Sequence, residues 1–155
     1  MVQGKWFAPG SDPAAALAVR REVFGRGEDG LDALSWNVVV EQDDRPVASG
    51  RIWWQDGAFR LGDIGVLPAF RGRRLGDLTF RLLLFKAQSH FAREVRLAAP
   101  PEVQGFFSRL GFRQDPLTPL QENNPVEMVI AGDRIDLDSC KNCNRANCPN
   151  RKPDV

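Results

Sequence analysis

The sequence predicts an α/β protein of the α+β type, in which a mixed, mostly antiparallel central sheet is flanked by helices. Two features of the pattern carry this prediction. Three strand-like segments follow one another in the first half of the chain, and strands joined by short connections pair antiparallel. Helix-like segments stand before, between and after the strands, which places helices on both faces of the sheet. A chain of 155 residues is long enough for one such domain with a sizeable core.

Helical patterns occur at three places, which are Pro13 to Phe24, Asp77 to Ala92 and Val103 to Leu110. In the middle segment the spacing puts four apolar residues along one stripe, namely Leu78, Leu82, Phe85 and Leu84. We expect that stripe to belong to the core.

Five segments read as strands, and the first three are expected to pair antiparallel. Asp56 and Gly57 form a turn pair between two of them. Asn123-Asn124-Pro125 reads as the loop before the last strand. The predicted strands are Asn37 to Gln42, Pro46 to Gln55, Ala58 to Val66, Val95 to Ala99 and Val126 to Ala131.

Composition limits the classes of partner. The chain is 43% hydrophobic and 26% charged, as in soluble globular proteins, and has no apolar run that would span a membrane and no signal-peptide pattern. We therefore expect a cytoplasmic protein. Its formal net charge of +1 favours neither nucleic acid nor a membrane surface as partner. However, residues 45–113 hold 12 basic and 5 acidic residues, and a basic middle suits a ligand with several phosphates.

An arginine- and glycine-rich loop between an apolar strand and a helix predicts an anion site. The unpaired N–H groups of the first helical turn and the helix dipole both favour a phosphate there. Arg71, Arg73 and Arg74 add charge, and Gly72 and Gly76 remove Cβ atoms that would hold a ligand away. An ordinary strand-to-helix turn with solvated arginines remains the alternative. Asp77 favours the helix start, but its charge near phosphates suggests that it points away from the ligand.

The spacing of this loop fits neither the P-loop nor the dinucleotide-binding fingerprint. It resembles the acetyl-coenzyme A signature of the GNAT N-acetyltransferases, Val-x-Pro-x-x-Arg-Gly-x-Gly-x-Gly. The matching residues are Val66, Pro68, Arg71, Gly72 and Gly76, while Arg74 stands where the family usually has Gly. A second motif of the family is similar to residues 102–112, with their closing Leu-Gly-Phe. The resemblance implies a GNAT-like domain over residues 1–135 and a separate tail over residues 136–155.

The resemblance implies the acyl-CoA N-acyltransferase fold and acetyl-CoA as cosubstrate. In the family the strand before the loop splays away from its neighbour, and its free backbone groups bind the pantetheine arm and the acetyl oxygen. Gly65 inside a strand independently suggests a bulge or a close backbone approach. The implied cofactor-binding residues are Ile64, Gly65, Val66, Arg71, Gly72, Arg73, Arg74, Leu75, Gly76, Asp77 and Phe107.

Acetyl transfer from a thioester to an amine needs a base for the amine and a proton for the departing thiolate. Asp63, Glu41 and Glu22 are the candidate bases, and a water relay is the alternative. The family often uses a Tyr as acid where this chain has Phe107, and the chain contains no Tyr. Either the thiolate leaves unassisted, Ser108 or water substitutes, or the protein binds the cofactor without fast turnover.

Other residues are candidates for the acceptor side. The resemblance places Asp32 and Trp36 in the region that usually faces the acceptor. Trp53 and Trp54 are candidates for lining an acceptor pocket, although one of two adjacent strand residues must face the core. His90 lies near the end of the long helix, where a cation is favoured, and reads as a surface or capping residue.

All three cysteines lie in the tail, as Cys140, Cys143 and Cys148. Thiolates at this spacing chelate Zn²⁺ or an iron–sulfur cluster, and a fourth ligand would come from Asp136, Asp138, His90, water or a partner chain. A redox Cys-x-x-Cys pair and an inert tail are the alternatives.

The sequence thus predicts an acetyl-CoA-dependent N-acetyltransferase that acts by direct attack of an amine, from a small molecule or a protein. The alternatives are an acyl-CoA-binding sensor without catalysis and a metal- or redox-responsive module on the same fold. Many members of the family are dimers, so a homodimer is a further expectation. The acceptor is not identified by the sequence.

Overall fold

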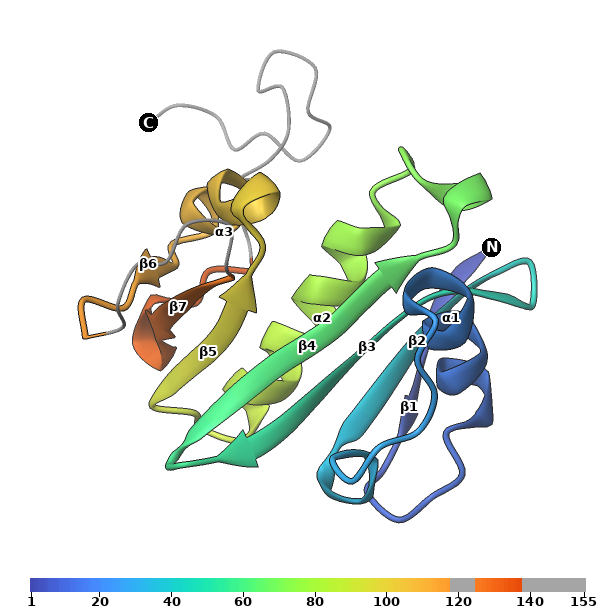
Figure 1. Ribbon diagram of the computed structural model, residues 1–155, viewed down its shortest axis with the longest axis horizontal. Coiled ribbons are helices and arrows are strands. Elements are labelled where there is room, and N and C mark those ends of the chain that lie inside the picture. The colour runs from blue at the N-terminus through green and yellow to red at the C-terminus, as the bar shows by residue number, and fades with distance from the viewer. Residues whose placement is uncertain (118–124, 138–155) are drawn as a thin grey trace.

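In the computed structural model, residues 1–117 and 125–137 are described, and they form one seven-stranded sheet with helices on both faces (Figure 1). The strand order is β1-β2-β3-β4-β5-β7-β6. The strands are β1 (Val2–Phe7), β2 (Trp36–Gln42), β3 (Arg45–Gln55), β4 (Ala58–Val66), β5 (Glu94–Ala99), β6 (Arg113–Gln114) and β7 (Val126–Ala131).

Every neighbouring pair in the sheet is antiparallel except β4 and β5, which are parallel. The predicted mixed, mostly antiparallel sheet is therefore confirmed. Asp56 and Gly57 both have positive φ, 52° and 79°, which are the backbone angles of the tight hairpin turn expected there. The sequence pattern did not predict the edge strands β1 and β6.

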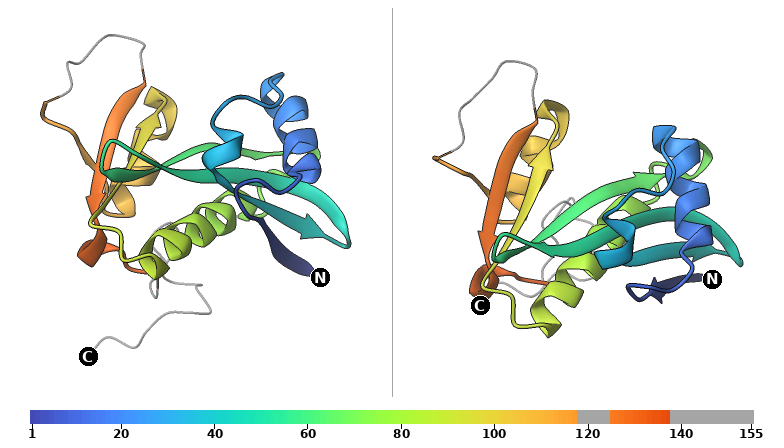
Figure 2. Two further views of the ribbon diagram at one scale, coloured as in Figure 1. Left: turned by 90° about the horizontal axis from the view of Figure 1, so that it is seen from below. Right: turned by 60° about the horizontal axis from the view of Figure 1, so that its bottom comes forward.

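The helices are α1 (Ala14–Phe24), α2 (Leu75–Ser89) and the short α3 (Gln104–Arg109). Helices α1 and α2 lie on opposite faces of the sheet, as the view from below shows (Figure 2). Helix α1 ends at Gly25, whose φ of 68° lets its N–H bond the carbonyl of Arg21. Helix α2 begins two residues before the predicted start at Asp77 and ends at the cap residue His90.

The apolar stripe predicted for α2 lies on a different side of the helix from the face that is buried against the sheet. The fully buried face carries Phe80, Leu83, Leu84 and Ala87, and only Leu84 of these was predicted. Phe85 is 57% exposed, so its assignment to the core is wrong. The helix is apolar on so much of its surface that spacing alone does not decide which side meets the sheet.

The main core lies between α2 and the sheet. It includes Val38, Ile52, Leu61, Phe80 and Val95, which come from four strands and α2. A smaller cluster of Val40, Val47, Ala48 and Leu75 holds the N-terminal end of α2 against β2 and β3. This cluster fixes the start of α2 relative to the end of β4, where the predicted anion loop lies.

Candidate active site

A cavity of about 480 Å³ opens where β4 and β5 separate. The two strands pair at only two positions, Phe59 with Val95 and Arg60 with Arg96, and they diverge beyond these (Figure 1). The separation leaves backbone groups of β4 open to the cavity. The lining residues are Leu61, Gly62, Asp63 and Ile64 of β4, Leu97 and Ala98 of β5, Gly76, Asp77 and Phe80 of α2, Phe106 and Phe107 of α3, and Phe24, Arg26, Pro100 and Val103.

A β-bulge shapes the wall of this cavity. Ser49 pairs with Gly65 and Arg51 pairs with Gly62, so Asp63 and Ile64 together face the single residue Gly50. Asp63 has a φ of 52°, in the left-handed region, as bulge residues often do. The bulge therefore turns the backbone of β4 at the point where the strand separates from β5.

Gly65 was expected to mark either a bulge or a close approach to the backbone. It allows a close approach of α1 to the backbone of β4. A Cβ atom there would lie 2.8 Å from a methyl carbon of Val23 and 2.9 Å from the ring of Phe24. Because no real Cβ atom approaches so closely, Gly65 lets the end of α1 pack directly on β4. The neighbouring residues Ile64 and Val66 are both partly buried.

The loop from Arg71 to Gly76 leads into α2, as the pattern predicts. Arg74 occupies the N-cap position with φ 61° and ψ 22°, and no side chain caps the helix. The first intrahelical bond runs from the Leu78 N–H to the Arg74 carbonyl, so the first-turn N–H groups of Leu75, Gly76 and Asp77 have no acceptor within the helix. An uncapped helix start of this kind is suited to bind an anion.

The three arginines of the loop are exposed and surround that helix start. Arg71 folds back, and its Nε donates to the Val66 carbonyl at 3.1 Å. Arg73 donates to Gln42 Oε1 at 3.3 Å and lies over the ring of Phe70, 5.2 Å from its centre. Gly72, with φ 83°, has open space where a Cβ would lie. The loop thus presents positive charge to solvent beside free backbone donors.

Asp77 belongs to the cavity wall. Its Oδ2 accepts from Arg81 Nε at 3.0 Å, one helical turn along. Its Oδ1 is buried and has no hydrogen-bond partner within the described part of the chain. A buried carboxylate oxygen without a partner is costly, and the ion pair that Oδ2 makes with Arg81 offsets part of that cost.

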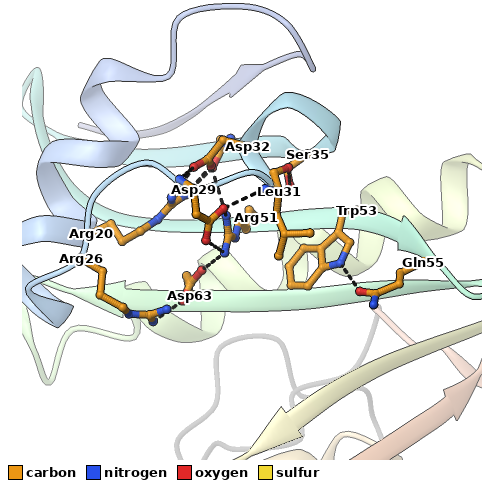
Figure 3. A network of polar contacts seen from close by, with 11 residues as sticks. Arg20, Arg26, Asp29, Leu31, Asp32, Ser35, Arg51, Trp53, Gln55 and Asp63 are labelled. Carbon is orange, nitrogen blue, oxygen red and sulfur yellow. Dashed lines mark hydrogen bonds and ion pairs between the residues drawn. The ribbon is translucent and has the colours of Figure 1, made fainter.

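Asp63 also lines the cavity, but both of its oxygens are already bound. Oδ1 accepts from Arg26 Nη2 at 2.5 Å, and Oδ2 lies 2.7 Å from Arg51 Nη2 (Figure 3). A proton arriving on this carboxylate would break an ion pair. The geometry is that of a carboxylate that holds the bulge in place.

Asp63 belongs to a larger charge network on the α1 face (Figure 3). Arg51, whose side chain is 3% exposed, donates to Asp29 at 2.7 and 2.8 Å and also to Asp32. Arg20 holds Asp32 through two bonds of 2.9 and 3.0 Å and reaches Asn37 at 2.9 Å. Three arginines and three aspartates thereby join α1, the following loop, β3 and β4.

The network lowers the pKa values of two of its aspartates. The hydrogen bond from Arg51 lowers the pKa of Asp29 to about 2. Burial acts to raise the pKa of Asp32, but the hydrogen bonds from Arg20 and from the Asp29 N–H outweigh it, and the pKa is lowered. Asp32 is 6% exposed, so its carboxylate is engaged within the network. It does not line the cavity.

The remaining candidates for proton transfer lie away from the cavity. Glu41 accepts from Gln3 at 3.1 Å and pairs with Lys5 at 3.1 Å, and these bonds lower its pKa. Glu22 and Ser108 are exposed and do not belong to the cavity wall. Phe107, in contrast, does line the cavity, with its ring centre 5.1 Å from that of Phe80.

The tryptophans do not form the cavity either. Trp53 is buried beside Arg51, and Trp54 is 56% exposed against Phe59, so the adjacent pair faces opposite ways as expected. Trp36 lies near the C-terminal end of α2, where Lys86 Nζ is 3.9 Å from its ring centre. His90 caps α2 and is exposed, which agrees with the capping interpretation.

The three cysteines of the tail lie outside the described residues. Within residues 1–117 and 125–137, no group of three or more His, Cys, Asp or Glu side chains is arranged to hold a metal ion. In the same ranges, no helix is both long enough and apolar enough to span a membrane.

Sequence reasoning missed several residues of the cavity. Phe24 and Arg26 come from the end of α1, and Phe80 and Phe106 add aromatic walls. The one available signal for Arg26 was its place directly after the helix-ending Gly25. No local pattern brings that turn to β4, because the contact depends on packing across the sheet.

Comparisons with known proteins agree with this geometry. The chain matches the sequence model of the family described as Acetyltransferase (GNAT) domain over residues 35–114. It is 37% identical over 87 residues to GCN5-related N-acetyltransferase 1, chloroplastic, of Arabidopsis thaliana. That match covers 55% of this chain and 43% of the relative, so the chain spans less than half of that protein.

Solved structures are similar in fold. An acyl-CoA N-acyltransferase from Pseudomonas aeruginosa superposes with a TM-score of 0.74 at 22% identity, covering 84% of this chain and 100% of that one. A GNAT family acetyltransferase from Elizabethkingia anophelis with acetyl-CoA bound gives a TM-score of 0.67 at 12% identity, covering 84% of this chain and 97% of that one. At such low identity these likenesses establish the fold.

Proposed function

The chain belongs to the GNAT acetyltransferase family, and from this premise we propose that it is an acetyl-CoA-dependent N-acetyltransferase that works by direct attack of an amine. The single observation that supports the proposal best is the cavity between β4 and β5, which begins beside the uncapped start of α2. A long, thin cosubstrate with phosphates at one end and a thioester at the other suits this arrangement.

The residues present fit that cosubstrate. Arg71, Arg73 and Arg74, together with the first-turn N–H groups of α2, would hold its phosphates. The apolar walls of the cavity, including Ile64, Leu97 and Phe107, would enclose the pantetheine arm and exclude water. When bound, acetyl-CoA supplies an activated acetyl thioester.

The open edge of β4 would orient the reacting carbonyl. Backbone N–H groups near the bulge at Asp63 and Ile64 are held in place by the β3 pairing and the arginine network. Preorganised donors of this kind stabilise the oxygen charge that develops as the amine attacks. In our proposal Arg26 and Arg51 act on the reaction through Asp63, as positioning residues.

Two protons must move as the nitrogen–carbon bond forms and the carbon–sulfur bond breaks. The attacking amine loses one, and water takes it because both oxygens of Asp63 are bound. The thiolate takes its proton from water, because Phe107, which lines the cavity, cannot donate one.

The position of Phe107 also favours a second candidate function, an acyl-CoA-binding sensor without fast turnover. Its ring occupies the wall of the cavity, where a hydroxyl would be needed for acid catalysis. The two functions share the cofactor site and differ in whether acetyl transfer occurs after binding. A sensor would bind acetyl-CoA tightly and release little thiol when amines are added.

Calorimetric titration with acetyl-CoA and with coenzyme A, followed by thiol release in the presence of an amine panel, tests the proposal. We expect micromolar binding and thiol release that depends on an amine. Arg71→Ala should weaken acetyl-CoA binding by about 1 to 3 kcal/mol, through loss of a charge-assisted phosphate contact. Arg21→Ala is the matched control, because Arg21 is also exposed but belongs to α1 and not to the loop before α2. An unchanged dissociation constant in Arg71→Ala would remove the loop from the cofactor site.

A further inference from the structure

Among the described residues that line the cavity, Arg26 is the one that carries a positive charge. It follows the left-handed residue Gly25 that ends α1. Its guanidinium lies over the ring of Phe24, 5.3 Å from the ring centre, and donates through Nη2 to Asp63 at 2.5 Å. Two contacts thus fix the head of a side chain that is still 57% exposed.

The acids near Arg26 are already compensated. Asp63 is 10% exposed and is also bound by Arg51, whose side chain is buried. The other acid of the cavity wall, Asp77, pairs with Arg81. Arg26 stands at one end of the charge network (Figure 3), lines the cavity and has a side chain that is more than half exposed.

A guanidinium carries five N–H donors, and the contact with Asp63 uses Nη2. The remaining donors of a side chain this exposed are available to an incoming group. A carboxylate matches the planar fork best, and a charge-assisted bond of that kind is among the stronger polar contacts. A polyamine or a lysine side chain would instead bring one positive charge toward another.

We propose that the acceptor is a small amine that also carries an anionic group, and that Arg26 binds this group. The inference rests on the proposed acetyltransferase function and names the substrate class for it. Arg26 is then a specificity-determining residue on the α1 side of the cavity.

Matched pairs of acceptors test the proposal. β-Alanine is compared with its amide, and O-phosphoethanolamine with ethanolamine, with spermidine as a cationic amine. Thiol release is expressed per concentration of unprotonated amine, so that differences in amine basicity do not enter. We expect kcat/KM to favour the anionic member of at least one pair by about tenfold or more. The two pairs distinguish a carboxylate from a phosphate as the group recognised.

Arg26→Gln should reduce that preference to about twofold or less, mainly by raising the KM of the acceptor. Arg26→Lys should retain part of it, because the charge stays while the fork is lost. Arg21→Gln, an exposed arginine outside the cavity wall, should keep the full preference. Arg26→Gln also removes the ion pair with Asp63, so its circular dichroism spectrum and its dissociation constant for acetyl-CoA are measured to show that the variant folds and binds. The ratio between the anionic and neutral acceptors, rather than the absolute rate, is the readout.

Equal use of both members of each pair, faster use of spermidine, or a preference that survives in Arg26→Gln would overturn the inference and leave the acetyltransferase proposal standing. Failure of every amine to cause thiol release, although acetyl-CoA binds, would overturn the acetyltransferase proposal itself and the inference with it. The binding measurement separates the two failures.

Discussion

Arg74 holds a left-handed backbone conformation at the start of α2, with φ 61°. A side chain in this region costs about 1 to 2 kcal/mol, whereas glycine adopts it freely. The residue also adds a positive charge beside the helix start. Arg74 therefore affects stability and ligand affinity in opposite directions.

We predict that Arg74→Gly stabilises the protein by about 0.5 to 1 kcal/mol, because relief of strain exceeds the entropy that glycine adds to the unfolded chain. Its affinity for acetyl-CoA should fall severalfold with the lost charge. Arg73→Gly is the matched control, since Arg73 does not have a positive φ. It should lose affinity and stability together. Urea unfolding and calorimetric titration measure both quantities, and a loss of stability in Arg74→Gly would contradict the argument.

Phe107 lines the cavity, with its ring centre 5.2 Å from that of Phe106. We predict that Phe107→Tyr raises kcat by about tenfold or more if protonation of the thiolate limits turnover, because it adds a proton donor. The dissociation constant of acetyl-CoA should change little. Phe106→Tyr adds the same hydroxyl at the neighbouring position and should not raise kcat. Equal rates in Phe107→Tyr and the unchanged protein would mean that this proton transfer is not limiting.

At the scale of elements, the arginine–aspartate network fastens α1 and its following loop to β3 and β4. Arg51 is central, since its guanidinium contacts Asp29, Asp32 and Asp63. Burial acts to lower the pKa of Arg51, whereas its contacts with the three aspartates act to raise it. The aspartates prevail, so the pKa is raised. Removing one partner of a buried pair leaves an uncompensated charge, which is far more costly than losing the pair as a whole. The bulge of β4 thus depends on residues from three other parts of the chain.

The network predicts a loss of stability in acid. A carboxyl whose pKa is lower in the folded state stabilises the protein above its unfolded pKa and stops doing so as pH falls through the folded pKa. For Asp29 this window runs from 3.8 down to about 2. We expect the free energy of unfolding to fall across this range, and to fall less in Asp29→Asn. At neutral pH that variant should lose up to about 1 kcal/mol, since Asp29 is partly exposed.

Urea unfolding followed by circular dichroism at a series of pH values checks this. Asp56→Asn, in the turn between β3 and β4, is the matched control and should follow the unchanged protein. If Asp29→Asn shows the same acid dependence as the unchanged protein, the ion pair with Arg51 does not contribute to stability in this window.

At the scale of the molecule, β7 joins the sheet by pairing with β5 along its length, and Gly132 extends this pairing by one further hydrogen bond. Its N–H donates to the Arg93 carbonyl at 2.7 Å, just after β7 and just before β5. A Cβ atom there would lie 1.7 Å from the carbonyl oxygen of Ala92. Any side chain would force two backbone segments apart.

We predict that Gly132→Ala destabilises the protein by about 3 kcal/mol or more, because backbone rather than a flexible side chain must move. Gly105→Ala in α3 is the matched control, since a Cβ there meets nothing within 4 Å. That change should be neutral or stabilising by up to about 1 kcal/mol. Thermal unfolding of both variants measures the difference, and similar melting temperatures would show that the Gly132 contact is readily relaxed.

The local order of strands, turns and helices follows from residues that are neighbours in the chain. Alternating and β-branched residues fixed β2, β3 and β4, and the Asp56-Gly57 pair fixed the hairpin between the latter two. The anion loop and the start of α2 were predictable for the same reason, since their residues adjoin in the chain. Edge strand β1 was not, because its residues are mostly exposed and carry little hydrophobic pattern.

Which residues share the cavity, and which carboxylates are bound in ion pairs, depends on contacts between distant parts of the chain. Asp63, a candidate base, lines the cavity, but its partners Arg26 and Arg51 lie 37 and 12 positions away along the chain. Asp77 turned toward the cavity and Phe85 away from the core because of how α2 is rotated on the sheet. Spacing in a sequence reports neighbours along one element, whereas charge pairing and helix rotation depend on surfaces that meet only after the sheet has formed.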